Sequence, residues 1–382
     1  MAENYQICSR CVMDTSDPNI VFDSDGVCNH CSSAINNIEK YWLRGRDGKI
    51  KLEQLFKQIK AEGINNKYDC IIGLSGGIDS SYLAYLASQY GLRMLAVHVD
   101  AGFNSKIAEN NVKNLCEKLG IDLVVEYVDF NEMMDLQRAY FFAGVPNEDI
   151  PQDHAFFTVL YSYAEKNKIK YVINGSNLAT ESILPVAWGH DAYDTRNIKD
   201  IHKKFGSKPL KNYKLMRFYD WYIKYRFFNK LIILNPLNYM DYNKEEAIKV
   251  LEKEVGWQYY GGKHYESRFT KLFQAHILPV KFGYDKRKAH LSSLIVAGQI
   301  TREEAIKELD KSLYDVQELE EDIIYFINKI GITREEFDKI MSLPPRKHED
   351  FKTNTAILNV LRRMYSYYIK LFNLKSETRV QV

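Results

Sequence analysis

The sequence predicts an α/β fold: a mostly parallel sheet with helices on both faces, with an N-terminal zinc-binding segment and a helical C-terminal region. Three observations support this prediction. Strand-like and helix-like apolar runs alternate between residues 67 and 177, four of the six cysteines lie within the first 31 residues, and the chain from 301 to about 373 has mainly helical periodicity. Because strands that alternate with helices are joined by crossovers, they form a mostly parallel sheet. We expect three parts, at residues 1–45, 46–240 and 241–382.

Composition indicates an ordinary globular protein. The chain has 382 residues, 46% of them hydrophobic and 27% charged. Its length exceeds the size at which a single hydrophobic core stops growing. The net charge of +2 does not by itself indicate a nucleic-acid binder. No apolar run approaches the roughly 20 residues needed to span a bilayer, and the start of the chain has neither a basic nor an apolar signal region. We therefore expect a cytoplasmic protein without a membrane span.

The N-terminal cysteines have the spacing of a metal site. Cys8, Cys11, Cys28 and Cys31 form the pattern C-x2-C-x16-C-x2-C, in which each pair presents two thiolates to one tetrahedral ion. Zinc is the expected occupant, and four cysteine ligands leave no open position, so its role is structural. Iron, an iron–sulfur cluster, disulfides and unligated thiols remain alternatives. Cys70 and Cys116 lie in apolar patterns and are expected in the core.

The elements of the middle region follow one another in a regular order. Strands are predicted at 68–74, 93–100, 121–129 and 169–176, and helices at 79–91, 107–120 and 154–168, with a long loop before the last helix. In parallel sheets, ligands bind beyond the carboxyl ends of the strands. The distinctive polar residues of this sequence follow those ends.

The junction of the first strand and its helix reads Leu74-Ser75-Gly76-Gly77-Ile78-Asp79-Ser80-Ser81. Glycines allow a sharp turn, and the N–H groups at a helix start, together with serine hydroxyls, form a cradle for phosphate. The loop is neither a Walker A sequence nor a G-x-G-x-x-G sequence. A carboxylate inside a phosphate cradle is unfavourable unless a divalent cation lies between them, so Asp79 predicts Mg²⁺.

SGGIDS resembles the SGGxDS signature of the PP-loop ATP pyrophosphatases, the adenine nucleotide alpha-hydrolase-like group. This resemblance implies that ATP is cleaved between its α- and β-phosphates and that a substrate carbonyl oxygen is adenylylated. It implies catalytic roles for Asp79 and Ser80 and ATP contacts along the loop and at two later strand ends. The implied ATP-binding residues are Leu74, Ser75, Gly76, Gly77, Asp79, Ser80, Ser81, Val99, Asp100, Gly175 and Asn177, with Asn174 and Glu181 as possible Mg²⁺, ATP or substrate contacts. A turn or helix-cap role for Asp100 remains an alternative.

Six further segments narrow the resemblance and extend it over nearly the whole chain. They are CSRCVMDTSDPNIVFDSDGVCNHC, SGGIDSS, PQDHAFF, INGSNLATES, GGKHYESRFTKLFQ and KFGYDKRKAHLSSLIVAGQITREEA. Together they resemble the N-acetyl sugar amidotransferases of bacterial surface-polysaccharide and flagellar-glycan pathways, the WbpG type more than the PseA type. This implies ATP-dependent conversion of an acetamido group on a nucleotide-linked sugar to an acetamidino group, in O-antigen or lipopolysaccharide synthesis.

The same resemblance implies a source of ammonia outside the chain. The sequence begins Met1-Ala2 and contains no cysteine in a glutaminase-like elbow, so we expect a separate glutaminase subunit, with a cyclase-like subunit that conducts ammonia. Two polar clusters near glycine resemble the family's patterns and would suit a uronic carboxylate or a diphosphate. The residues of these clusters are Lys263, His264, Glu266, Lys281, Asp285, Lys286 and Arg287; loop and helix-end charges are the alternative explanation.

A basic, aromatic segment leaves a second function open. Residues 199–230 contain ten Lys and Arg against two Asp, with nine aromatic residues, whereas residues 301–322 contain nine acids against three bases. The basic segment would suit RNA, a nucleotide-sugar or an acidic partner, or form an amphipathic helix with a solvated basic face. The rival functions are a PP-loop enzyme that modifies tRNA and a zinc-ribbon interaction protein that senses ATP, although nucleic acid is the less expected partner.

Overall fold

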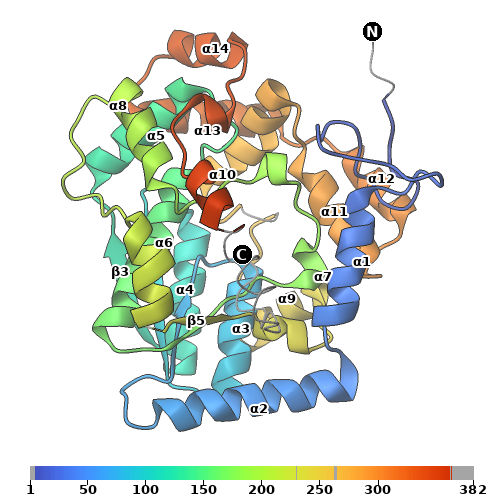
Figure 1. Cartoon of the computed structure of the whole chain (residues 1–382), viewed down its shortest axis with the longest axis vertical. Coiled ribbons are helices and arrows are strands. Elements are labelled where there is room, and N and C mark those ends of the chain that lie inside the picture. The colour runs from blue at the N-terminus through green and yellow to red at the C-terminus, as the bar shows by residue number, and fades with distance from the viewer. Residues whose placement is uncertain (1–4, 229, 262–264, 362, 364–382) are drawn as a thin grey trace.

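The protein is built around a five-stranded, wholly parallel sheet, which confirms the predicted α/β fold (Figure 1). The computed structural model describes residues 5–228, 230–261, 265–361 and 363. The strand order is β3-β2-β1-β4-β5. The strands are β1 (Cys70–Gly73), β2 (Met94–Asp100), β3 (Asp122–Tyr127), β4 (Tyr171–Ile173) and β5 (Ile232–Leu234). The central strand β1 pairs with β2 and β4, so that Cys70 lies opposite both Met94 and Tyr171.

Helices cover both faces of the sheet because side chains alternate along each strand. Cys70 and Ile72 point into a core shared with one group of helices, and Ile71 points into a second core on the opposite face. The first face is covered by α2 (Gly45–Gly63), α3 (Ile78–Gln89), α4 (Lys106–Leu119) and α9 (Lys244–Val255). The second is covered by α6 (Ile150–Lys166). Both faces are thus apolar, as a parallel sheet requires.

The C-terminal region is helical, as predicted, through α14. Its elements are α10 (Arg268–Leu272), the π-helix η4 (Phe273–Phe282), α11 (Lys286–Val296), α12 (Arg302–Leu309), α13 (Val316–Ile330) and α14 (Arg334–Ser342). A capping box formed by Thr301 and Glu304 opens α12, as the sequence Thr301-Arg302-Glu303-Glu304 indicates. Phe326 and Phe337 pack against Phe141, and Phe269 packs against Phe326. This aromatic core joins the C-terminal region to α5 (Phe130–Ala143).

Seven further elements lie in the described chain. They are α1 (Asn29–Tyr41), α7 (Leu178–Glu181), η1 (Val186–Trp188), α8 (Thr195–Phe205), η2 (Asp220–Phe228), η3 (Pro236–Tyr239) and η5 (His348–Asp350). Figure 1 shows α2 across one end of the molecule, α14 at the other end, and the N-terminal segment beside α11 and α12. Among the described residues, no helix combines the length and the apolar character needed to cross a membrane.

Two elements differ from the sequence prediction. The segment 130–153, predicted as a long loop, contains α5 and the first turn of α6. Most residues of α5 are buried around its whole circumference, which removes the one-sided apolar periodicity by which a helix is usually recognised. Strand β5 was not predicted, since it has only three residues and follows the basic segment. Cys70 and Cys116 are both buried in the core, as expected.

Candidate active site

The SGGIDS loop connects β1 to α3 in the geometry of an anion cradle. Gly77 is the N-cap residue of α3, and no side chain caps this helix start. Gly76 has a φ of +88°, and a Cβ at this position would lie 2.6 Å from the carbonyl oxygen of Ala108. Glycine is therefore required at residue 76 by both backbone conformation and space. The N–H groups of the first turn of α3 and the positive end of its dipole favour phosphate here.

The predicted serines of this loop divide into two groups. The Ser75 hydroxyl accepts a hydrogen bond from the Gly77 N–H at 3.2 Å, and the Ser80 hydroxyl donates to the Gly77 carbonyl at 3.4 Å. Both are only partly buried. Ser81 is fully buried, and its hydroxyl has no hydrogen-bond partner among the described residues. Ser75 and Ser80 thus border the cradle, whereas Ser81 lies on the buried side of α3.

The predicted loop after β4 packs directly on the start of α3. A Cβ on Gly175 would lie 2.8 Å from the backbone carbon of Asp79 and the backbone nitrogen of Ser80. The side chain of Asn177 caps α7, accepting from the Thr180 N–H at 3.0 Å, and Asn174 accepts from the Ser176 N–H at 3.1 Å. The structure therefore brings the two predicted ATP-facing loops together. It uses the Asn177 and Asn174 side chains to shape the second loop.

Asp79 has a neighbour that sequence reasoning missed. The Tyr242 hydroxyl donates a hydrogen bond to the Asp79 carboxylate. Burial and the nearby carboxylates of Asp79 and Glu181 raise the pKa of Tyr242 well above its ordinary value, so that it remains a donor. Two side chains also reach the loop from 257–266: the Trp257 indole donates to the Gly76 carbonyl at 3.1 Å, and the Tyr260 hydroxyl lies 3.5 Å from the position of a Cβ on Gly77.

Glu266, predicted as a substrate contact, lies at the phosphate loop. One of its carboxylate oxygens is 3.5 Å from the position that a Cβ on Gly77 would take. Burial, followed by the charges of Glu266 and Asp79, raises the pKa of Tyr260. Asp79 and Glu266 thus bring carboxylate oxygens to the cradle, and the charge of Glu181 acts on Tyr242, the partner of Asp79. Carboxylate oxygens are the ligands that Mg²⁺ prefers. This donor set fits a magnesium–nucleotide complex.

The end of β2 is tied to the same edge of the sheet. The His98 ring shares a hydrogen bond of 2.7 Å with the Leu74 carbonyl through Nδ1, and its Nε2 lies 3.1 Å from the Asn104 amide nitrogen. The Asp100 carboxylate accepts from the Gly102 N–H at 2.7 Å, which is the turn role left open by the sequence. Val99 is 7% exposed. Whether Val99 and Asp100 contact a nucleotide remains a prediction.

The four N-terminal cysteines form a cluster that fits a metal ion. Their sulfur atoms all lie within 4.8 Å of one another, and all four residues are fully buried. Backbone N–H groups point at the sulfurs, among them that of Cys28 at 3.2 Å from the Cys8 Sγ. Hydrogen bonds from Cys11 and Cys31 lower the pKa of Cys28 to about 4, which favours its thiolate. Sulfur ligands in this number are typical of zinc and of iron–sulfur centres.

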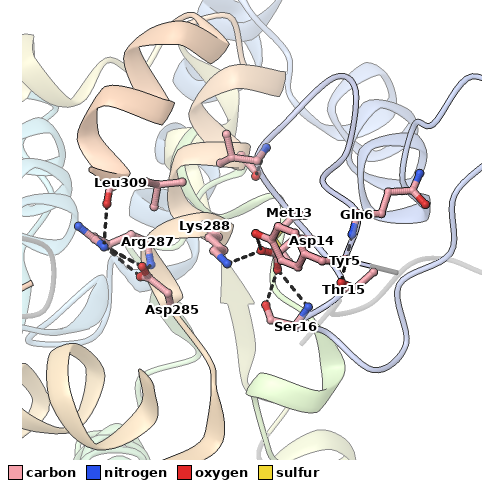
Figure 2. Close-up of polar contacts among 12 residues, drawn as sticks. Tyr5, Gln6, Met13, Asp14, Thr15, Ser16, Asp285, Arg287, Lys288 and Leu309 are labelled. Carbon is pink, nitrogen blue, oxygen red and sulfur yellow. Dashed lines mark hydrogen bonds and ion pairs between the residues drawn. The ribbon is translucent and has the colours of Figure 1, made fainter. Parts of the chain in front are cut away.

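The cysteine module, residues 5–31, is attached to the C-terminal region by buried polar contacts. Figure 2 shows the Lys288 ammonium of α11 directed at the Asp14 carboxylate, with which it forms an ion pair. Arg302 donates to the carbonyl oxygens of Cys11 at 3.0 Å and Cys8 at 3.2 Å. The Ser292 hydroxyl of α11 accepts from the Val12 N–H at 3.2 Å, and the hydroxyl of the next residue, Ser293, accepts from the Ile183 N–H at 2.9 Å. A continuous set of contacts therefore links the cysteine cluster, α11 and the loop that begins with α7.

The remaining predicted substrate residues have partners within the protein. Arg287 forms an ion pair with Asp285 at 2.8 Å and donates to the Leu309 carbonyl at the end of α12 at 3.3 Å (Figure 2). It also donates to the Lys311 carbonyl just beyond this helix at 2.8 Å. Lys281 donates to the Leu343 carbonyl at 2.8 Å, and Lys286 lies 3.7 Å from Asp149. Lys281 and Arg287 therefore neutralise helix C-termini, the role that the sequence left as an alternative. Lys263 and His264 lie outside the described residues.

Aromatic side chains of the basic segment 199–230 pack in the protein core, and some of its lysines form ion pairs. Trp221 and Tyr225 are buried, and Trp221 stacks on Tyr193 with ring centroids 4.0 Å apart. Lys214 and Lys224 pair with Glu126 and Glu165. The described part of this segment therefore has an aromatic core face and a solvated basic face.

Two family models match parts of the chain. Residues 266–365 match "LPS biosynthesis protein WbpG-like, C-terminal domain", and residues 51–215 match NAD synthase. The uncharacterized protein MJ1599 of Methanocaldococcus jannaschii is 24% identical over 80% of this chain and 93% of its own length. The tRNA-specific 2-thiouridylase MnmA 2 of Fusobacterium nucleatum is 31% identical over 29% of this chain. This chain spans only 34% of that relative.

A comparison with solved structures found similarity to the NH3-dependent NAD synthetase of Campylobacter jejuni. It is 18% identical, covers 55% of this chain and 84% of its own, and has a TM-score of 0.30. The family matches, taken with the loop geometry, support a PP-loop, ATP-using domain followed by a WbpG-like C-terminal region.

Proposed function

We propose that this protein is an ATP-dependent amidotransferase that converts an acetamido group of a nucleotide-linked sugar to an acetamidino group. The observation that carries the proposal is the SGGIDS cradle with Asp79 at the start of α3, in a chain whose residues 266–365 match the WbpG-like C-terminal domain. A UDP-linked diacetamido uronic acid is the proposed substrate, in the synthesis of a bacterial surface polysaccharide.

The reaction requires activation because amide resonance makes the acetamido carbon a poor electrophile. The carbonyl oxygen attacks the α-phosphorus of ATP and pyrophosphate leaves, which gives an O-adenylyl imidate. Ammonia then adds to the imidate carbon, one proton moves from the added nitrogen to the sugar nitrogen, and the carbon–oxygen bond breaks. AMP departs with the former carbonyl oxygen and leaves a protonated acetamidine. The products are an acetamidine, AMP and pyrophosphate. Catalysis of this kind depends mainly on positioning and charge stabilisation at the α-phosphate.

The chain's own groups fit these tasks. The N–H groups of α3 and the Ser75 and Ser80 hydroxyls would hold the pyrophosphate. Asp79, kept in place by Tyr242, would hold Mg²⁺ together with Glu181 or Glu266. The ion supplies charge neutralisation on the phosphates. Structural zinc would occupy the four cysteines.

Ammonia is proposed to come from a separate glutaminase subunit, through a cyclase-like partner. A direct test compares the purified chain with ammonium salts and with glutamine as nitrogen donor. If the chain alone uses glutamine as efficiently as ammonium, no partner is required and this part of the proposal fails.

A PP-loop enzyme that modifies tRNA is the second candidate, favoured by the similarity to the tRNA-specific 2-thiouridylase. The two functions separate in one assay with ATP, Mg²⁺ and ammonium. The proposal predicts AMP and pyrophosphate formation stimulated by a UDP-linked diacetamido sugar. Stimulation by tRNA but not by the sugar would overturn it.

A further inference from the structure

Buried polar side chains without partners gather around the start of α6. Asn147 and Glu148 are both 0% exposed, and Gln152 is 2% exposed. Both polar atoms of Asn147, both carboxylate oxygens of Glu148 and the amide nitrogen of Gln152 have no hydrogen-bond partner among the described residues. One ring nitrogen of His190 and one of His348, whose rings stack 4.4 Å apart, also have none. We call these five residues the α6 polar set. The charge of Lys286, which lies 3.7 Å from Asp149 at the start of α6, acts on His190.

Such a concentration is unusual in a folded protein. More than about 90% of buried polar groups have a hydrogen-bond partner, and each one without a partner costs about 1–3 kcal/mol. The α6 polar set would therefore weaken the fold unless its atoms serve another purpose. Groups arranged to bind a polar ligand meet this condition, because the ligand supplies the partners.

The topology places this set on the functional edge of the sheet. Helix α6 precedes β4 and runs back across the sheet, so its first turn lies at the carboxyl ends of the parallel strands. Gln152 accepts a hydrogen bond from the Ser267 hydroxyl at 3.4 Å, and Glu266, the preceding residue, reaches the phosphate loop beside Gly77. The adjacent residues Ser267 and Glu266 thus connect the α6 polar set to the ATP cradle.

The chemistry of the set indicates a neutral ligand. Burial raises the pKa of Glu148 well above its ordinary range, and burial with the charge of Asp149 raises that of Asp153 to about 8. Burial lowers the pKa of His190 to about 3. At neutral pH these groups are uncharged donors and acceptors, like the carboxamides of Asn147 and Gln152. Hydroxyl and amide groups match such a surface. The two cations nearby already have partners, since Lys281 donates to the Leu343 carbonyl and Lys286 lies 3.7 Å from Asp149.

We propose that the α6 polar set binds the acetamido and hydroxyl groups of the acceptor sugar and presents one acetamido oxygen to ATP in the neighbouring cradle. This inference rests on the proposed function and adds to it the residues that recognise the sugar ring. Gln152 is a specificity-determining residue: Ser267 holds its amide oxygen, which leaves its amide nitrogen to donate to the ligand. His190 is the member of the set that is only partly buried, so it borders the set toward solvent.

The test uses Gln152→Leu and a matched control on the same helix, Thr158→Val. Thr158 is 7% exposed and its hydroxyl also lacks a partner among the described residues, but it lies six residues further along, about 9 Å from Gln152 along the helix axis. Full-length variants are assayed with ATP, ammonium and a UDP-linked diacetamido uronic acid. Binding of the same sugar is measured separately by calorimetry without ATP.

Gln152→Leu is expected to raise the KM and the dissociation constant for the sugar by roughly 10-fold, the effect of about one hydrogen bond. The KM for ATP should stay unchanged, and Thr158→Val should leave both constants unchanged. If Gln152→Leu does not fold, His190→Phe keeps the stacked ring but removes its nitrogens and is expected to act in the same direction.

The outcomes distinguish this inference from the proposed function. If the wild type forms the amidine but the folded variants retain its sugar constants, the α6 polar set is not the sugar site and the function stands. If the wild type binds the sugar through Gln152 but forms no amidine, the site stands and the function fails. An equal rise in the KM for ATP and for the sugar would also overturn the assignment, because it would place the set in the ATP site.

Discussion

The ion pair between Asp14 and Lys288 offers a quantitative test of how the cysteine module is held against α11. The Asp14 side chain is fully buried, and the Lys288 side chain is 19% exposed. Asp14 also accepts hydrogen bonds from the Tyr5 hydroxyl at 2.5 Å and the Ser16 N–H at 3.1 Å. Lys288→Met removes the cation but keeps the length and the apolar part of the side chain.

The expected loss follows from leaving a charge buried. Removing one partner of a buried ion pair costs about 3–5 kcal/mol, and the hydrogen bonds from Tyr5 and Ser16 place this case near 3 kcal/mol. The free energy of unfolding is measured by urea titration at pH 7 on the metal-loaded chain. Lys113→Met serves as the control because its pair with Glu117 is 69% and 65% exposed, and its loss should stay below about 0.5 kcal/mol.

The pH dependence of the free energy of unfolding provides a second test of Lys288→Met. Burial acts to raise the pKa of Asp14, but Lys288, Ser16 and Tyr5 outweigh it and lower this pKa below its ordinary value of 3.8. Stability from a lowered carboxyl pKa is present above that value and is lost as the pH falls through the pKa of the folded state. The difference between Lys288→Met and wild type should therefore shrink below about pH 4. A loss under 1 kcal/mol at pH 7, or one that does not vary with pH, would refute the burial argument.

Three further changes test other parts of the structure. Gly175→Ala places a Cβ 2.8 Å from the backbone of Asp79 and should weaken ATP binding, measured by calorimetry, by about 1–3 kcal/mol. The control Gly73→Ala, whose Cβ meets only Leu160 at 3.5 Å, should bind ATP normally. Equal ATP affinities of the two variants would contradict the close packing of the two loops. Chelation should release one metal ion per chain and lower the midpoint of thermal unfolding, and Cys28→Ser should abolish metal binding; a stoichiometry near zero in the native protein would exclude the metal site. Burial lowers the pKa of His154 from 6.5 to about 4, so between these pH values the unfolded chain binds one more proton than the folded chain. The free energy of unfolding should therefore fall by up to about 3 kcal/mol as the pH drops from 6.5 to 4. If the dependence of this free energy on pH is the same in His154→Gln, His154 is not its source.

The sequence was most informative where a motif acts locally. The phosphate cradle needs only a strand, a glycine turn and a helix start, and the cysteine cluster needs only two closely spaced pairs, so both could be predicted without knowledge of the fold. The capping box at Thr301 and Glu304 is equally local.

Contacts between distant segments were not predictable in this way. Tyr242 reaches Asp79 across 163 positions, and Trp257 reaches Gly76 across 181, because α9 packs with α3 in a core that also includes residues of the sheet. Lys281 and Arg287 looked like ligand-binding cations since they lie beside glycine. In the structure they bind carbonyl oxygens at helix ends, a use that depends on where α12 and α14 stop.

The transfer of oxygen is the most direct test of the proposed chemistry. The acetamido carbonyl of the UDP-linked sugar is labelled with ¹⁸O, and the full-length protein converts it with ATP, Mg²⁺ and ammonium. Adenylylation of the carbonyl oxygen predicts that the label leaves the sugar and appears in the phosphate of AMP, in an amount equal to the amidine formed. Label retained in the sugar while AMP accumulates, or recovered in inorganic phosphate with ADP, would contradict it.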